Sequence, residues 1–163
     1  MKSELIRKFD QTWRLFARIV SEFDESAWLQ TGRGQITPAG FSFHILQSAK
    51  FYLEDKSTIL FESGKPFEPK WDTVKKEDLP SQEDILACMK IFQQKGTDWV
   101  NEMDILAENT SFDWTGETNL GTVLFMLHHM VFHVGELSSL LNESKNGNVE
   151  DPYVSTVSPS DSK

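Results

Sequence analysis

The residues best suited to chemistry in this 163-residue chain are three closely spaced histidines, His128, His129 and His133. They lie in a predominantly apolar run from Leu120 to Leu141 that contains no proline, which predicts a buried helix. Residues four apart on an α-helix differ by about 40° of rotation and about 6 Å of rise, so His129 and His133 share one face. Two imidazoles placed in this way can bind one metal ion.

The remaining histidine, His44, lies in a second predicted helix and is a candidate third ligand. A polar ring in a buried helix needs a partner for each nitrogen, such as a metal, a carboxylate or a backbone carbonyl. If the fold brings His44 opposite His129 and His133, the three rings form a metal site. The alternative interpretation is that the histidines fill hydrogen-bonding roles in the core, because a pair at a spacing of four also arises by chance.

Glu136 follows His133 by three residues, which predicts a position on the same side of the helix. It is the candidate catalytic residue, either as an acceptor that orients an imidazole or as a general base beside a bound water molecule. A solvated or interhelical carboxylate is the alternative. His128 points about 100° away from His129, which predicts an exposed position or a subunit contact. The chain holds no His-Glu-x-x-His motif and no Glu-x-x-His motif, which excludes a zincin protease and argues against a carboxylate-bridged di-iron bundle.

Length and composition limit the number of domains, the partners and the location that we expect for this protein. A chain of this length forms one domain with a substantial core, and its lone cysteine, Cys88, cannot form an internal disulfide. The formal net charge of -9 would repel a phosphate backbone, so we expect no nucleic-acid partner. The N-terminus carries no basic and apolar leader, and the longest apolar run falls short of a bilayer span, which predicts a cytoplasmic protein without a membrane partner.

Apolar residues at helical spacing predict four helices. The predicted helices span residues 3–23, 38–63, 81–107 and 118–144. Thr37 as N-cap and Pro38 in the first turn give the second helix a clear start, and Gly64 is placed as its C-terminal cap. Ser81 is the expected N-cap of the third helix.

The connection between the second and third helices is predicted to be long. From Gly64 to Pro80 it holds three prolines and little helical pattern. Fully extended, it could span about 55 Å, whereas the second helix as predicted is only about 39 Å long. The chain can therefore return along the whole bundle, which allows the second and third helices to run parallel.

The C-terminal residues 145–163 are polar and cannot bury a core of their own. We expect this tail to lie in extended form against the domain or a neighbouring chain, with Pro152-Tyr153-Val154 as its anchor. The predicted fold class is all-α, with a four-helix bundle over residues 1–144 and a polar tail over residues 145–163.

The order of these features resembles the DinB-like superfamily, which includes the YfiT-type proteins. The resemblance lies in a histidine near the start of the second helix, the pair His129 and His133 in the fourth, and the small residue and Glu136 that follow. It implies a four-helix bundle in up-down-down-up order with a long crossover between helices 2 and 3. It also implies that His44, His129 and His133 are the three metal ligands, with water completing the coordination.

The resemblance further implies a divalent metal, commonly zinc, nickel or iron, and frequent homodimers. Known activities in the superfamily are often thiol-dependent, such as transfer of bacillithiol or mycothiol-dependent isomerisation. We therefore expect a metal-dependent enzyme of the thiol S-transferase type, or a hydrolase, that acts on a small molecule with a low-molecular-weight thiol. The alternative is a non-enzymatic stress-linked or dimerisation bundle with structural histidines. The acidic composition offers no obvious site for the carboxylates of a thiol cofactor.

Overall fold

The computed structural model describes residues 1–32, 36–68 and 70–157, and these ranges are all-helical. The elements are α1 (Lys2–Glu22), α2 (Glu25–Trp28), α3 (Pro38–Tyr52), η1 (Lys76–Asp78), α4 (Gln82–Glu102), η2 (Asp113–Thr115), α5 (Asn119–Ser144) and α6 (Pro152–Val157). No strand forms within the described ranges, where the only β-type pairings are isolated bridges. The predicted all-α class is confirmed.

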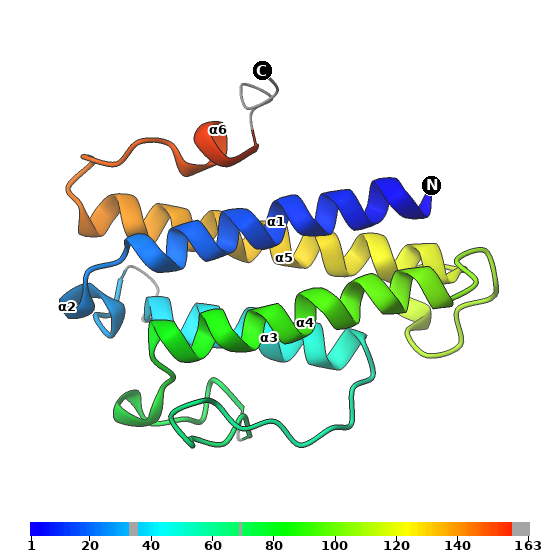
Figure 1. Cartoon of the computed structure of the whole chain (residues 1–163), viewed down its shortest axis with the longest axis horizontal. Coiled ribbons are helices and arrows are strands. Elements are labelled where there is room, and N and C mark those ends of the chain that lie inside the picture. The colour runs from blue at the N-terminus through cyan, green and yellow to red at the C-terminus, as the bar shows by residue number, and fades with distance from the viewer. Residues whose placement is uncertain (33–35, 69, 158–163) are drawn as a thin grey trace.

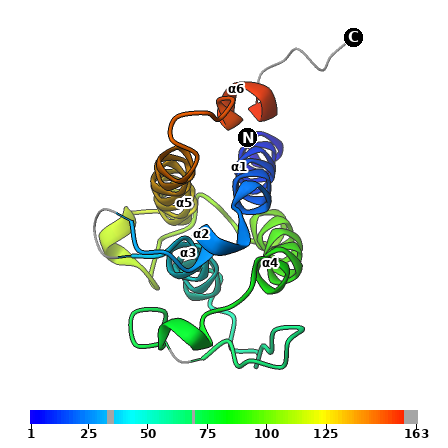
Figure 2. The ribbon, with the colours of Figure 1, turned by 90° about the vertical axis from the view of Figure 1, so that its left-hand side faces the viewer.

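The four long helices, α1, α3, α4 and α5, lie side by side around one core (Figures 1 and 2). α1 packs against α4 and α5, and α3 packs against the same two helices. In Figure 1 the chain runs from right to left in α1 and α5, and from left to right in α3 and α4. The helices that carry the four histidines, α3 and α5, are therefore antiparallel neighbours.

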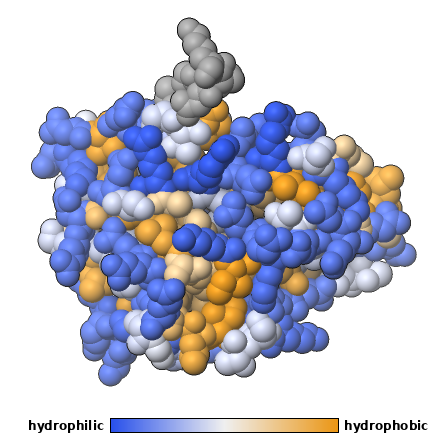
Figure 3. Space-filling model, viewed as in Figure 1, coloured by the Kyte–Doolittle hydropathy of each residue, from blue (hydrophilic) through white to orange (hydrophobic). Residues whose placement is uncertain are grey.

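The core is built from apolar stripes on the long helices. The predicted first stripe is buried: α1 carries Leu5, Phe9, Trp13, Phe16 and Val20, and Phe23 directly follows the helix. α5 buries an apolar stripe with spacings of three and four, made of Val123, Met126, Met130, Val134, Leu137 and Leu141, and it also buries Thr122. The face seen in Figure 3 is mostly hydrophilic, with smaller apolar areas between the polar side chains. The separation of a buried apolar face from an exposed polar face holds each bundle helix in one orientation.

α3 and α4 begin at the predicted N-caps. The side-chain oxygen of Thr37 accepts a hydrogen bond from the backbone N–H of Gly40, and Pro38 occupies the first turn. Ser81 and Asp84 form a reciprocal capping box at the start of α4. The short-range cap signals in the sequence therefore predicted both helix starts.

α3 ends at Tyr52, so the predicted extension to Ser63 is wrong. Glu54 adopts the left-handed conformation with φ of 50°, and the N–H of Asp55 bonds to the carbonyl of Lys50. This is the Schellman arrangement that ends many helices, and it usually places Gly or Asn where Glu54 stands. Because glutamate rarely adopts a positive φ, the sequence carries no recognisable stop signal at this point.

The other helix ends and the tail differ less from the prediction. α4 ends at Glu102 instead of Ala107, because Met103 is already extended. α5 covers the predicted range to Ser144. The tail forms the short helix α6 against α1 instead of an extended strap, and the prediction for residues 158–163 lies outside the described residues.

The crossover between α3 and α4 is longer than predicted, and Gln47 of α3 binds its backbone at two points. The Gln47 amide donates to the carbonyl of Phe67 at 3.0 Å and accepts from the N–H of Trp71 at 2.9 Å. Phe61 and Phe67 are buried in the core cluster. The crossover therefore lies along α3 and brings Trp71 to the helix that carries His44.

By length and composition α5 qualifies as a membrane-spanning helix, the only such case within the described residues. The expectation that its apolar run is too short for a bilayer span is therefore wrong. In the structure the buried stripe of α5 packs against α1 and α3, and the central helix of a bundle passes the same test.

The buried carboxylate of Asp84 joins the crossover to α4. It accepts hydrogen bonds from the N–H and the hydroxyl of Ser63, at 2.9 and 2.7 Å, and from the N–H of Ser81 at 3.2 Å. Asp84→Ala removes this acceptor, so the free energy of unfolding should fall by about 2 to 4 kcal/mol in urea denaturation. Glu83→Ala, at the exposed neighbouring position, is the matched control and should cost less than about 1 kcal/mol. Equal losses in the two variants would contradict this role of Asp84.

Candidate metal centre

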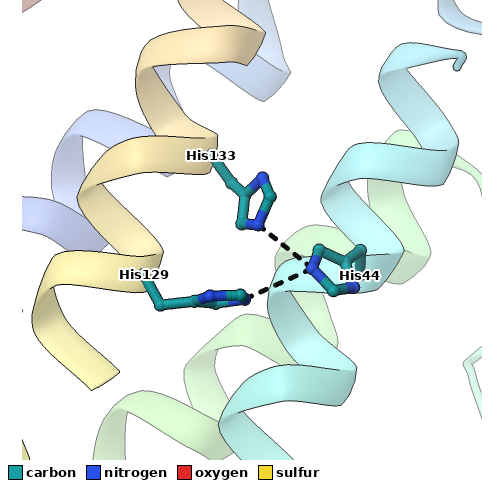
Figure 4. Close-up of side chains that lie close together, drawn as sticks. All are labelled: His44, His129 and His133. Atoms are coloured by element: carbon teal, nitrogen blue, oxygen red, sulfur yellow. Dashed lines mark hydrogen bonds between the residues drawn. The ribbon is translucent and has the colours of Figure 1, made fainter. Parts of the chain in front are cut away.

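His44 of α3 meets His129 and His133 of α5 in one cluster (Figure 4). Nε2 of His44 lies 3.1 Å from Nε2 of His133 and 3.2 Å from Nε2 of His129. A tetrahedral ion with bonds of about 2.0 to 2.1 Å holds its ligand nitrogens about 3.3 Å apart, so this spacing fits a metal ion. His128, which the sequence places beside the cluster, is exposed.

Glu136 lies against His133, with Oε2 at 2.6 Å from Nδ1. A carboxylate can only accept, so the Nδ1–H of His133 is the donor in this hydrogen-bond network. In the neutral ring, Nε2 then keeps its lone pair, which points toward His44 (Figure 4). This is the tautomer that a metal ligand requires. Glu136 therefore occupies the place of an orienting acceptor, which is one of the roles considered from the sequence.

Ser48 is a residue of the cluster that the sequence analysis did not identify. Its Oγ lies 3.1 Å from Nε2 of His129. Ser48 follows His44 by four residues on α3, so the two side chains repeat the spacing of His129 and His133 on α5. That repeated spacing is the signal that could have identified it.

Aromatic side chains surround the histidine cluster. The ring of Trp71 lies 5.0 Å from the ring of His44, and the ring of Phe41 lies 5.8 Å from that of His133. Trp71 comes from the crossover, in which no periodic pattern indicated a contact with α3. These rings replace water around the imidazoles, so the electrostatic interactions among them are stronger than at an exposed site.

The surroundings favour neutral imidazoles. Burial and, after it, the charges of the neighbouring His133 and His129 together lower the pKa of His44 to about 4, against an opposing effect of Asp72. Burial, and then the charge of a protonated His133, also lower the pKa of His129. Neutral imidazole is the form that binds metal ions, so at neutral pH protons do not compete for these two rings.

A cavity of about 730 Å³, which we call the site cavity, opens on His44 and His129. Its walls come from the second half of α3, from the crossover and from Phe112 in the loop before α5. A second cavity of about 670 Å³ borders Phe41 and Glu136. Both volumes fall in the range of small-molecule sites. The histidine cluster is therefore accessible to a small molecule.

Comparison of the chain with protein-family models, with curated proteins and with solved structures found no match in any of the three. The resemblance to the DinB-like superfamily accordingly stays a prediction made from the sequence. The case for a metal site rests on the geometry and the protonation of the histidines.

The lowered pKa of His44 predicts that the metal-free protein loses stability in acid. The pKa is about 4 in the folded state and 6.5 without perturbation. Between these values the unfolded chain binds more protons than the folded chain, so the free energy of unfolding falls as the pH falls. From pH 7 to pH 5, His44 alone should lower it by up to about 2 kcal/mol, and by less where water screens the half-buried ring.

Urea denaturation of chelator-treated protein at the two pH values measures this effect. Over the same interval, the free energy of unfolding of His44→Gln should fall by up to about 2 kcal/mol less than that of the unmodified chain. His128→Gln is the control, because His128 is exposed. Its free energy of unfolding should fall as much as that of the unmodified chain. Identical losses in all three proteins would show that His44 is not held neutral.

Proposed function

We propose that this protein is a divalent-metal-binding member of the DinB-like superfamily, with residues 1–144 as an up-down-down-up four-helix bundle and residues 145–163 as its tail. The helix directions in Figure 1 and the long crossover between α3 and α4 support this topology. His44, His129 and His133 would hold the ion. The observation that carries the proposal is that their ligand atoms all lie within 4.8 Å of one another.

The donor set fits zinc, nickel or iron, since imidazole is a good ligand for each of these metals. Three neutral imidazoles leave the ion its positive charge, whereas structural zinc sites are usually closed by four protein ligands. Within the described residues the cluster comprises three histidines and no fourth histidine, cysteine or carboxylate ligand. Together with the site cavity, this arrangement supports a catalytic site with an open coordination position.

The reaction that we propose is the transfer of a low-molecular-weight thiol to a small electrophile: the sulfur forms a bond to the electrophilic carbon, the bond from that carbon to its leaving group breaks, and the leaving group departs with the thiol proton. A divalent cation at the histidines supplies a Lewis acid, which lowers the pKa of a nearby thiol or water molecule. Glu136 holds the proton on Nδ1 of His133 and fixes the orientation of that ring. Ser48 is placed to bond a polar group of a reactant beside His129, and Trp71 restricts the access of water. The site cavity receives the acceptor.

The alternative is a non-enzymatic, stress-linked or dimerisation bundle with structural histidines. The hydrogen bonds of Ser48 to His129 and of Glu136 to His133 favour this alternative, because they already give two of the three rings a partner. For both functions we propose a cytoplasmic homodimer. α5 exposes the apolar side chains of Val131 and Phe132, which a second copy of the chain would cover.

The proposed site predicts that each chain binds one divalent ion. Chelator-treated protein reloaded with zinc, nickel or iron(II) should contain about one equivalent by elemental analysis. The double variant His129→Ala, His133→Ala should bind none, because two of the three ligands are lost. His128→Ala removes a histidine next to the same site and should keep the full metal content.

An unchanged metal content in the double variant would overturn the proposed site. The reloaded protein can also be screened with low-molecular-weight thiols and electrophilic acceptors. The enzymatic proposal requires turnover that chelation abolishes and that metal restores. Full metal binding without turnover of any pair would favour the non-enzymatic alternative.

The contact between Glu136 and His133 predicts an effect on metal affinity. Glu136→Gln removes the charged acceptor of the Nδ1 proton, so zinc affinity should fall about 10- to 100-fold in competition with a chromophoric chelator. Glu143→Gln, further along α5 and exposed, is the matched control and should change the affinity less than about twofold. Equal affinities in the two variants would show that Glu136 does not position His133.

A further inference from the structure

The walls of the site cavity combine a group of aromatic side chains with charged ones. The rings of Phe51 and Tyr52 lie 5.2 and 5.4 Å from the ring of Phe112, and Trp71 lies beside His44. Phe51 leaves 56% of its surface exposed. A large apolar ring in contact with water is unfavourable, and a flat apolar molecule in the cavity would cover it.

The acidic side chains in the cavity wall are neutralised or lie in water. The largely buried Asp55 forms an ion pair of 2.5 Å with Lys95. Glu54 accepts a hydrogen bond from the hydroxyl of Ser111 and is exposed, as is Asp72. Charges at exposed positions are screened by water, so these carboxylates contribute little attraction for a cationic ligand.

Lys50 is the charged side chain of the cavity wall that is best placed to bind a ligand. Its side chain is only 16% exposed, and its Nζ lies 3.6 Å from Oε1 of Glu68, which is longer than a hydrogen bond. Glu68 is 72% exposed, so the pairing is weak. A partly buried ammonium group gains most from an anion that reaches hydrogen-bonding distance. A ligand anion can therefore replace Glu68 at Lys50.

We propose that the site cavity binds a planar apolar molecule that carries one anionic group, such as an aromatic carboxylate. The anionic group pairs with Lys50, the flat part lies against Phe51 and Trp71, and the cavity leads from there to His44 and His129. This inference rests on the proposed function, because it names the class of the small electrophile. The positive charge of an ion held by neutral imidazoles would also favour a negatively charged ligand.

The charge preference can be measured on chelator-treated protein with three probes of matched size. These are 2-naphthoate, the neutral 2-naphthalenemethanol and the cation 2-naphthylmethylammonium. Isothermal titration calorimetry should give naphthoate an affinity about tenfold above that of the alcohol, with the cation weakest, because Lys50 adds a charge-assisted hydrogen bond. Tighter binding of the cation, or no binding of any probe, would overturn the proposal.

Variants of Lys50 test the residue itself. Lys50→Met keeps an unbranched apolar side chain and removes the charge, so the naphthoate affinity should fall about tenfold while the alcohol affinity stays within about twofold. Lys50→Arg should keep most of the naphthoate affinity. Lys56→Met changes an exposed lysine of the same cavity wall and is the matched control, with the naphthoate affinity within about twofold. Equal losses for naphthoate and the alcohol in Lys50→Met would indicate a packing defect and would overturn the role of Lys50.

The absence of metal in these titrations separates the inference from the proposed function. If the probes fail to bind while the reloaded protein holds one ion per chain, the ligand class is wrong and the metal site stands. If the protein binds no metal but prefers naphthoate, the cavity stands as a ligand site and the metal-dependent function is wrong.

Discussion

Three imidazoles can share a few ångströms of partly buried space only if they are not all charged. Burial and mutual repulsion disfavour protonation of His44 and His129, and Glu136 holds the proton of His133 on the nitrogen that faces away from His44. The result is a cluster of ring nitrogens between α3 and α5, in which Nε2 of His133 keeps the lone pair that faces His44. The proposed site depends on that packing contact, because neither helix carries three of these histidines by itself.

The crossover between α3 and α4 shapes the surroundings of this cluster. Gln47 binds the backbone at Phe67 and Trp71, and Asp84 binds the backbone and hydroxyl of Ser63. The Gln47 bonds hold this irregular segment along α3, where it supplies the aromatic neighbour of His44 and one wall of the site cavity, and the Asp84 bonds join it to α4. The same connection that allows α3 and α4 to run parallel therefore also determines what can approach the histidines.

Much of the fold could be predicted because its signals are local. The N-caps at Thr37 and Ser81, the stripe of α1 and the full range of α5 follow from spacing and from cap chemistry within a few residues. The end of α3 could not be predicted, because Glu54 closes the helix with a positive φ that its residue type does not favour. The sequence likewise gave no indication that Lys50 would face an aromatic cavity within an acidic chain, since the cavity is formed by segments distant along the chain.

By itself the sequence determined that His129 and His133 lie side by side, because a spacing of four residues on a helix fixes their relative position. It also placed Glu136 within reach of His133 for the same reason. Only the tertiary structure decided that His44 and Ser48 face the pair, and that Trp71 lies beside them. Helical periodicity is a local property of the backbone, whereas contacts between segments tens of residues apart depend on how all the apolar faces pack together.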